Sequence, residues 1–152
     1  MQMYPNLEPK SIEKSLLFDE KRLHLKIISF FVLAVLLQLC LTAQILTVGL
    51  AYFHNSTWWV THILFVRGYS ILSLILCVWA FVIPLPKRIR IFAGSLPILL
   101  RAQYLTVHIN LQIPFPLAIF HPLIGFTLFF TAITLVHRVS RMLFSHSDDK
   151  NT

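Results

Sequence analysis

The stretch IISFFVLAVLLQLCLTAQILTVGLAYF, residues 27–53, contains no charged side chain. A helix that crosses a bilayer needs about 20 mostly apolar residues, and this stretch is longer than that. Three further apolar stretches follow, at about 58–83, 91–113 and 117–137. The chain has 152 residues, of which 57% are hydrophobic and 12% charged, whereas soluble domains carry about a quarter charged residues. The sequence therefore predicts an integral membrane protein with four spans.

The connections between the predicted spans are short. Short connections force neighbouring helices to run antiparallel, which gives an all-α, up-down four-helix bundle over residues 27–144. In that arrangement the second and fourth spans are expected to lie diagonally across the core. Cys40 and Cys77 fall inside spans, where packing thiols are expected rather than a disulfide.

The basic residues predict the orientation of the bundle. The formal net charge is +7, and the basic side chains gather before the first span, between the second and third, and after the fourth: Lys10, Lys14, Lys21, Arg22, Lys26, Lys87, Arg88, Arg90, Arg138, Arg141 and Lys150. The other two connections, residues 54–57 and 114–116, have none. This pattern is typical of cytoplasmic termini and of contact with anionic lipid, and it argues against nucleic-acid binding.

The ends of the chain leave alternatives open. Residues 1–26 fit either a short amphipathic helix on the membrane surface or a partly ordered tail, and residues 145–152 are expected to be disordered. The fourth span begins either at His121, with Pro122 in its first turn, or near Leu117 with a bend.

Two histidines give the sharpest indication of chemistry. His62 and His121 each lie about four residues into a span that starts at the outer surface, roughly 6 Å below the rim. Neutral imidazoles on facing helices are standard axial ligands for haem iron. Gly125 lies one turn below His121, where the missing side chain would let a flat macrocycle approach. In the alternative, each histidine hydrogen-bonds a neighbouring helix or points to the headgroups.

Other polar side chains inside the spans widen the choice of site. His108 shares a helix face with Arg101 and Tyr104 and is a possible substitute for either histidine. Arg67 and Arg101 lie near mid-depth, and all six acidic residues lie in the two ends of the chain. Such arginines contact carbonyls or lipid phosphate, or else an acidic ligand such as a propionate or a quinone-type head. The amides of Gln44 and Gln103 either join neighbouring helices or contact a cofactor edge.

These motifs carry two resemblances. From Leu39 to Arg138 the chain resembles an uncharacterised bacterial family of small four-span membrane proteins, through Gln44 with Gly49, Trp58-Trp59 followed by His62, Leu99-Leu100 with Gln103, and Phe120-His121-Pro122. More distantly, the layout is similar to one half of haem A synthase, in which histidines near the outer ends of the second and fourth helices bind haem. That similarity implies that His62 and His121 form an axial pair. The chain departs from the synthase pattern at Trp58, Trp59 and Val60, where the synthase has an acidic residue, and it has one bundle only.

The function expected from the sequence is haem b binding and electron transfer within a membrane redox complex. Two histidines fill both axial positions, so an electron-transfer role is favoured over an enzymatic one. The main alternative is a cofactor-free accessory or assembly subunit that packs against other membrane subunits. A weaker option is a pigment or quinone binder that uses Arg67 and Arg101. The expected location is a bacterial inner membrane or a photosynthetic membrane.

Overall fold

The computed structural model of the protein describes residues 9–109 and 116–148, with side chains from residue 13 to residue 144. Four α-helices make up almost all of it: α1 (Pro9–Phe53), α2 (Trp58–Val82), α3 (Lys87–His108) and α4 (His121–Asp148). A short 3-10 helix, η1 (Leu117–Phe120), leads into α4. The described residues contain no strand, which confirms the all-α prediction.

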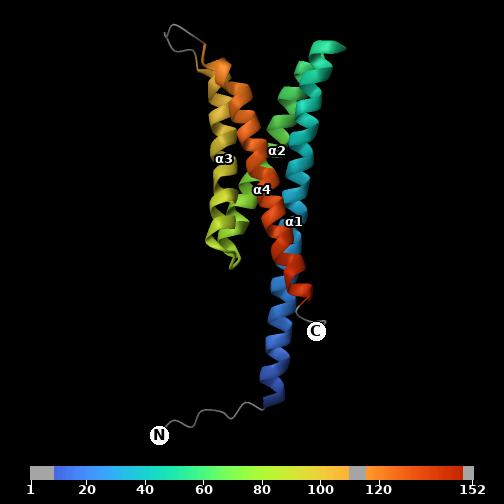
Figure 1. The fold of residues 1–152 in the computed structure, drawn as a ribbon, viewed down its shortest axis with the longest axis vertical. Helices are drawn as coiled ribbons and strands as arrows, with labels where there is room; N and C mark the ends of the chain where they lie inside the picture. The colour runs from blue at the N-terminus through green and yellow to red at the C-terminus, as the bar shows by residue number, and fades with distance from the viewer. Residues whose placement is uncertain (1–8, 110–115, 149–152) are drawn as a thin grey trace.

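The helices form a ring of neighbours. Each helix packs against two others, in the order α1, α2, α3, α4 and back to α1. Within the described residues α2 and α4 make no contact with each other, so they lie diagonally across the bundle, as predicted. The start of α1 and the end of α4 lie at the same end of the molecule (Figure 1). The chain therefore runs up, down, up and down.

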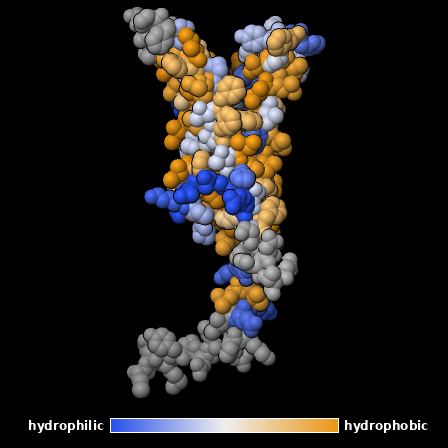
Figure 2. All heavy atoms as spheres, viewed as in Figure 1, coloured by the Kyte–Doolittle hydropathy of each residue, from blue (hydrophilic) through white to orange (hydrophobic). Residues whose placement is uncertain are grey.

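Three of the helical segments are long and apolar enough to cross a membrane: Glu13–Phe53, Trp58–Val82 and Leu117–Phe144. Apolar side chains cover much of the outer surface of the bundle (Figure 2). Together these features indicate a membrane protein.

Helix α3, which covers residues 91–108 of the third predicted span at 91–113, is not among these three segments. Helix α3 begins at Lys87 and ends at His108, and residues 110–113 lie outside the described part of the chain. The described helix α3 carries Lys87, Arg88 and Arg90 at its start and Arg101 further along. It packs against the apolar helices α2 and α4 all the same.

Helix α1 is much longer than the sequence pattern predicted. Its 45 residues extend for about 68 Å, more than twice the thickness of a hydrocarbon core of about 30 Å. Residues 9–26 form neither a separate surface helix nor an irregular tail, because they continue α1 without a break. This part of α1 projects beyond the bundle (Figure 1).

The start of the fourth helix follows the first of its two predicted alternatives. Pro116 leads into η1, and α4 then begins at His121 with Pro122 in its first turn. Proline is suited to this position, since the first turn leaves its backbone N–H groups without helical partners. At the other end α4 runs to Asp148, so residues 145–148 are helical, and residues 149–152 lie outside the described chain.

The buried residues reveal an internal repeat. On α1 they include Phe30, Ala34, Leu37 and Leu41, and on α3 they include Ile89, Ala93, Leu96 and Leu100. Each member of the second set lies 59 residues after its counterpart in the first. The same offset relates the buried residues of α2 to those of α4: Tyr69, Ser73, Leu76 and Ala80 to Leu128, Ala132, Leu135 and Val139. The bundle therefore consists of two equivalent hairpins, α1–α2 and α3–α4.

The two hairpins have the same orientation, and the contacts between them are equivalent, as expected for a two-fold arrangement. Helix α2 packs on α3, and α4 packs on α1. Near the end that carries residues 54–57, the hairpins move apart and leave a notch between them (Figures 1 and 2). The notch is at the end where α2 and α4 begin, which is also where His62 and His121 lie.

Candidate cofactor site

The internal repeat extends to polar residues. Gln44, Thr47 and His62 correspond, again with an offset of 59 residues, to Gln103, Thr106 and His121. In both hairpins the glutamine and threonine lie on the first helix and the histidine lies at the start of the second. We call these two groups the first and second Gln–Thr–His sets.

In the first set, the glutamine contacts the histidine at two places. Gln44 Nε2 lies 2.8 Å from His62 Nδ1 and donates to the His62 carbonyl oxygen at 3.0 Å. Thr47 Oγ1 donates to the Gln44 carbonyl oxygen at 2.7 Å and lies 3.1 Å from His62 Nδ1. Gln44 is almost fully buried, with 8% of its surface exposed. The set therefore ties α1 to α2 through buried polar groups.

In the second set, the His121 ring contacts a backbone carbonyl oxygen of α3. His121 Nδ1 lies 3.0 Å from the Gln103 carbonyl oxygen, to which a ring N–H would donate. Thr106 Oγ1 donates to the same oxygen at 2.6 Å and lies 3.3 Å from His121 Nδ1. Gln103 Nε2 lies 3.3 Å from His121 Nε2. The two glutamines thus approach different nitrogens of their histidines.

These contacts fit neutral imidazoles in different tautomers. Because Gln44 Nε2 can only donate, His62 Nδ1 accepts and its proton lies on Nε2. His121 has the opposite arrangement, since its Nδ1 faces a carbonyl oxygen and its Nε2 faces the Gln103 amide. Within the described residues, His62 Nε2 has no hydrogen-bond partner.

Both amides leave a buried acceptor unused. Gln44 Oε1 and Gln103 Oε1 are buried and have no partner among the described residues. A buried carbonyl oxygen without a donor is costly, so two at equivalent positions call for an explanation. A bound group or a water molecule that donates to them would provide one.

Gly125 has a different neighbour from the one expected. A Cβ atom added there would meet Gln103 Nε2 at 3.0 Å, which is closer than ordinary contact. The missing side chain therefore makes room for the Gln103 amide. The predicted approach of a macrocycle at this point would require that amide to move.

The two histidines lie on faces that point into the bundle. His62 is seven residues before buried Tyr69, and His121 is seven residues before buried Leu128, so each ring shares the buried face of its helix. The structure thus places both predicted ligands at inward-facing positions of one bundle, on helices that lie diagonally across it.

His108, Arg67 and Arg101 lie elsewhere. All three are exposed. The predicted face of α3 is confirmed, since Arg101 Cζ lies 5.9 Å from the centre of the Tyr104 ring and that ring stacks on His108 at 3.7 Å. His108 Nδ1 bonds within its own helix, to the Tyr104 carbonyl oxygen at 2.9 Å. These three residues lie outside the two Gln–Thr–His sets.

Aromatic residues border the first set. Tyr52 and Trp59 meet edge to face with ring centres 5.4 Å apart, and Trp59 meets His62 in the same way at 5.7 Å. Cys40 and Cys77 are free thiols, as predicted. No cluster of three or more His, Cys, Asp or Glu side chains that could hold a metal ion occurs in the part of the chain the structure describes.

The role of the two threonines was not predicted from the sequence. The signal was available, because Gln-Ile-Leu-Thr-Val at residues 44–48 recurs as Gln-Tyr-Leu-Thr-Val at residues 103–107. The repeat of this short motif, together with the equal spacing to His62 and His121, defines both sets.

The fold and the site define a class: a four-helix membrane bundle built from two equivalent hairpins, each with one Gln–Thr–His set. Within the chain, residues 44–109 match a family of unknown function, DUF6220. The matched segment contains the first set and also Gln103 and Thr106 of the second. It agrees with the predicted resemblance to an uncharacterised family. No curated protein and no solved structure matches the chain, and the similarity to haem A synthase stays a prediction.

Proposed function

We propose that the protein binds haem b through His62 and His121 and transfers electrons within a membrane redox complex. One observation carries the proposal. The two imidazoles occupy equivalent positions of a repeated hairpin, on buried faces of diagonal helices. A single group between the hairpins could take one ligand from each.

The surroundings of the two rings fit this role. A ligating imidazole normally donates its second N–H to a carbonyl or similar acceptor, which fixes the ring. His121 Nδ1 has such an acceptor in the Gln103 carbonyl oxygen at 3.0 Å. For His62, a proton on Nδ1 could be accepted by Thr47 Oγ1 at 3.1 Å, which would leave Nε2 free to bind iron.

Two adjustments would accompany binding. The Gln103 amide, 3.3 Å from His121 Nε2, would have to leave that nitrogen, and the Gln44 amide would have to turn away from a protonated His62 Nδ1. Both amides are ends of flexible side chains. A haem with two histidine ligands would supply one-electron redox chemistry, since no axial position stays open for a substrate.

The proposed setting follows the charge pattern. We place the end with Lys87, Arg88 and Arg90 on the cytoplasmic side of a bacterial inner or photosynthetic membrane, because basic residues favour that side. The apolar outer surface of the bundle would contact lipid and other membrane subunits.

Absorption spectroscopy tests the haem proposal. The protein is expressed with haem supplied and purified, and a reduced-minus-oxidised difference spectrum is recorded. The wild type should give a signal typical of two histidine ligands, and His62→Ala and His121→Ala should each abolish it. His108→Ala and His137→Ala are matched controls on exposed histidines and should retain it. A wild type without the signal, or its loss in His108→Ala alone, would contradict the assignment.

A second candidate is a cofactor-free accessory subunit. The observation in its favour is that both imidazoles already have hydrogen bonds within their own hairpins, so both sets can act as links between helices. Under this alternative the protein should purify from native membranes in a larger complex without a haem spectrum. His62→Ala and His121→Ala should then leave the size of the complex unchanged on a native gel.

A further inference from the structure

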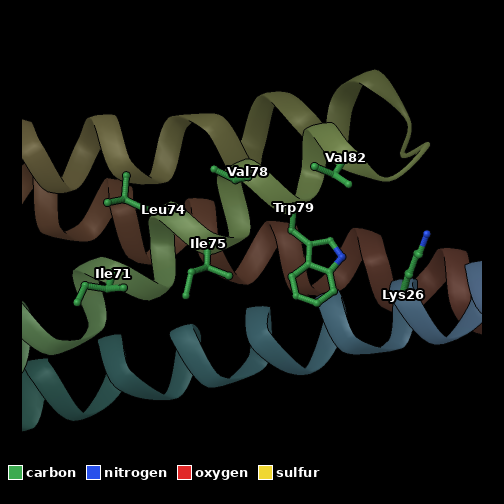
Figure 3. A pocket seen from close by; sticks show the side chains of 7 residues that line it. All are labelled: Lys26, Ile71, Leu74, Ile75, Val78, Trp79 and Val82. Carbon is green, nitrogen blue, oxygen red and sulfur yellow. The ribbon is translucent and has the colours of Figure 1, made fainter.

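An apolar groove runs along the outer seam between α1 and α2. Its lower part has a volume of about 480 Å³ and is lined on α2 by Ile71, Leu74, Ile75 and Val78. A second hollow of about 470 Å³ continues it toward Leu64 and shares Ile71 and Ile75 with the first. Figure 3 shows the lower part, in which Ile75 and Trp79 extend from α2 toward α1.

A single cation among the described residues lines the lower end of this groove. Trp79 and Val82 line it there, and Lys26 of α1 reaches it from the opposite helix. In Figure 3 the Trp79 ring lies between the apolar side chains and the Lys26 ammonium. Tryptophan at the boundary between an apolar surface and a charge is typical of the membrane interface. A cation thus stands at one end of a long hydrocarbon-like surface.

The length of the groove matches one lipid leaflet. From Ile71 to Val82, α2 rises about 17 Å, and half of a hydrocarbon core measures about 15 Å. An acyl chain that lies along this wall would therefore place its headgroup beside Lys26. Arg22 and Arg88 at the same end also favour a negatively charged headgroup.

We propose that the seam between α1 and α2 is a binding site for an anionic phospholipid, with an acyl chain along Ile71–Val82 and the phosphate beside Lys26. The site is separate from the two Gln–Thr–His sets, since His62 and His121 do not line it. The lipid would fill the seam of the first hairpin and stabilise the packing of α1 on α2.

Native mass spectrometry of the detergent-solubilised protein tests the headgroup. The protein is mixed with equal amounts of phosphatidylglycerol and phosphatidylcholine. The wild type should retain more phosphatidylglycerol, and Lys26→Gln should reduce that preference about fivefold, the ratio that corresponds to about 1 kcal/mol for one basic residue near an anionic surface. Lys87→Gln, which removes the same charge from an exposed residue outside the groove, should change the preference little.

A second pair of variants tests the groove itself. Ile75 lies where the two hollows join, so Ile75→Trp should fill the seam and reduce lipid retention. Ile98→Trp on α3 is the control, because Ile98 is exposed and lies outside both hollows. Equal retention of the two lipids by the wild type would overturn the proposal. So would an equal loss in Lys26→Gln and Lys87→Gln, or unchanged retention in a folded Ile75→Trp protein.

Discussion

Gln44 holds His62 by both its ring and its backbone. The same amide nitrogen lies 2.8 Å from Nδ1 and 3.0 Å from the His62 carbonyl oxygen. The second contact fixes the orientation of the amide, because an oxygen in that place would face another oxygen. Gln44 Oε1 is therefore directed away from His62, and it is buried without a partner among the described residues.

Gln44→Leu should destabilise the bundle. The substitution removes a side-chain amide that joins the start of α2 to α1, and the expected loss is about 1 kcal/mol, as for hydrogen bonds between membrane helices. The measurement is a denaturant titration in detergent micelles. Gln38→Leu is the control, because Gln38 Oε1 is buried without a partner among the described residues and its replacement should cost nothing.

Thr47→Val and Thr106→Val should lower stability by similar amounts. Each hydroxyl donates to the carbonyl oxygen of the glutamine in its own set, at 2.7 and 2.6 Å. Valine keeps the shape of threonine and removes the donor, so a loss of about 0.5–1 kcal/mol is expected for each. Thr42→Val, which removes an exposed hydroxyl bonded only to Gln38, should be close to neutral. A large effect at one site and none at the other would argue against equivalent sets.

Gly125→Ala should displace the Gln103 amide. The new Cβ would lie 3.0 Å from Gln103 Nε2, so the amide must turn and lose its contact with His121 Nε2 at 3.3 Å. Gly49→Ala is the control, because nothing lies within 4 Å of a Cβ at that position. Alanine is better than glycine in a helix by about 1 kcal/mol, so the control should gain stability and Gly125→Ala should not. Thermal unfolding of the two variants compares them.

Leu37→Ala and Leu96→Ala should cost similar free energies of unfolding. Both leucines are fully buried, at 1% and 0% exposure, and they occupy equivalent places in the two hairpins. A cavity left by a deleted leucine typically costs about 2–5 kcal/mol. Leu39→Ala, at an exposed position of α1, should have a small effect. Equilibrium unfolding of the three variants checks this equality.

Much of the fold followed from hydropathy. The predicted boundary at Phe53 and the second span at 58–83 agree closely with α1 and α2, since turn residues interrupt long apolar runs there. The predicted first span starts at residue 27, where the apolar run begins. Helix α1 begins earlier, at Pro9, because its charged first part is also helical, and hydropathy alone does not detect a polar helix. The third span stays a prediction, because residues 110–113 lie outside the described chain and the described helix α3 is not among the helices that qualify as a span.

The candidate site was predicted in part. The matched depth of His62 and His121 was visible in the sequence, since both follow loops without basic residues. Their hydrogen-bond partners were not, because Gln44 and Gln103 lie 18 residues away and could have faced any neighbouring helix. In the sequence the repeat is plain only in the Gln-x-Leu-Thr-Val motif and its spacing to each histidine, because other paired residues, such as Tyr69 and Leu128, differ. The pattern of burial extends the equivalence along all four helices.

The turn between α2 and α3 separates two halves of similar size, each with one imidazole of the pair. A chain cut at Pro86 would leave neither fragment with both ligands of the proposed haem. Co-expression of the fragments would then restore the absorption signal only where the halves reassociate, which makes the colour of the protein a direct reporter of hairpin pairing.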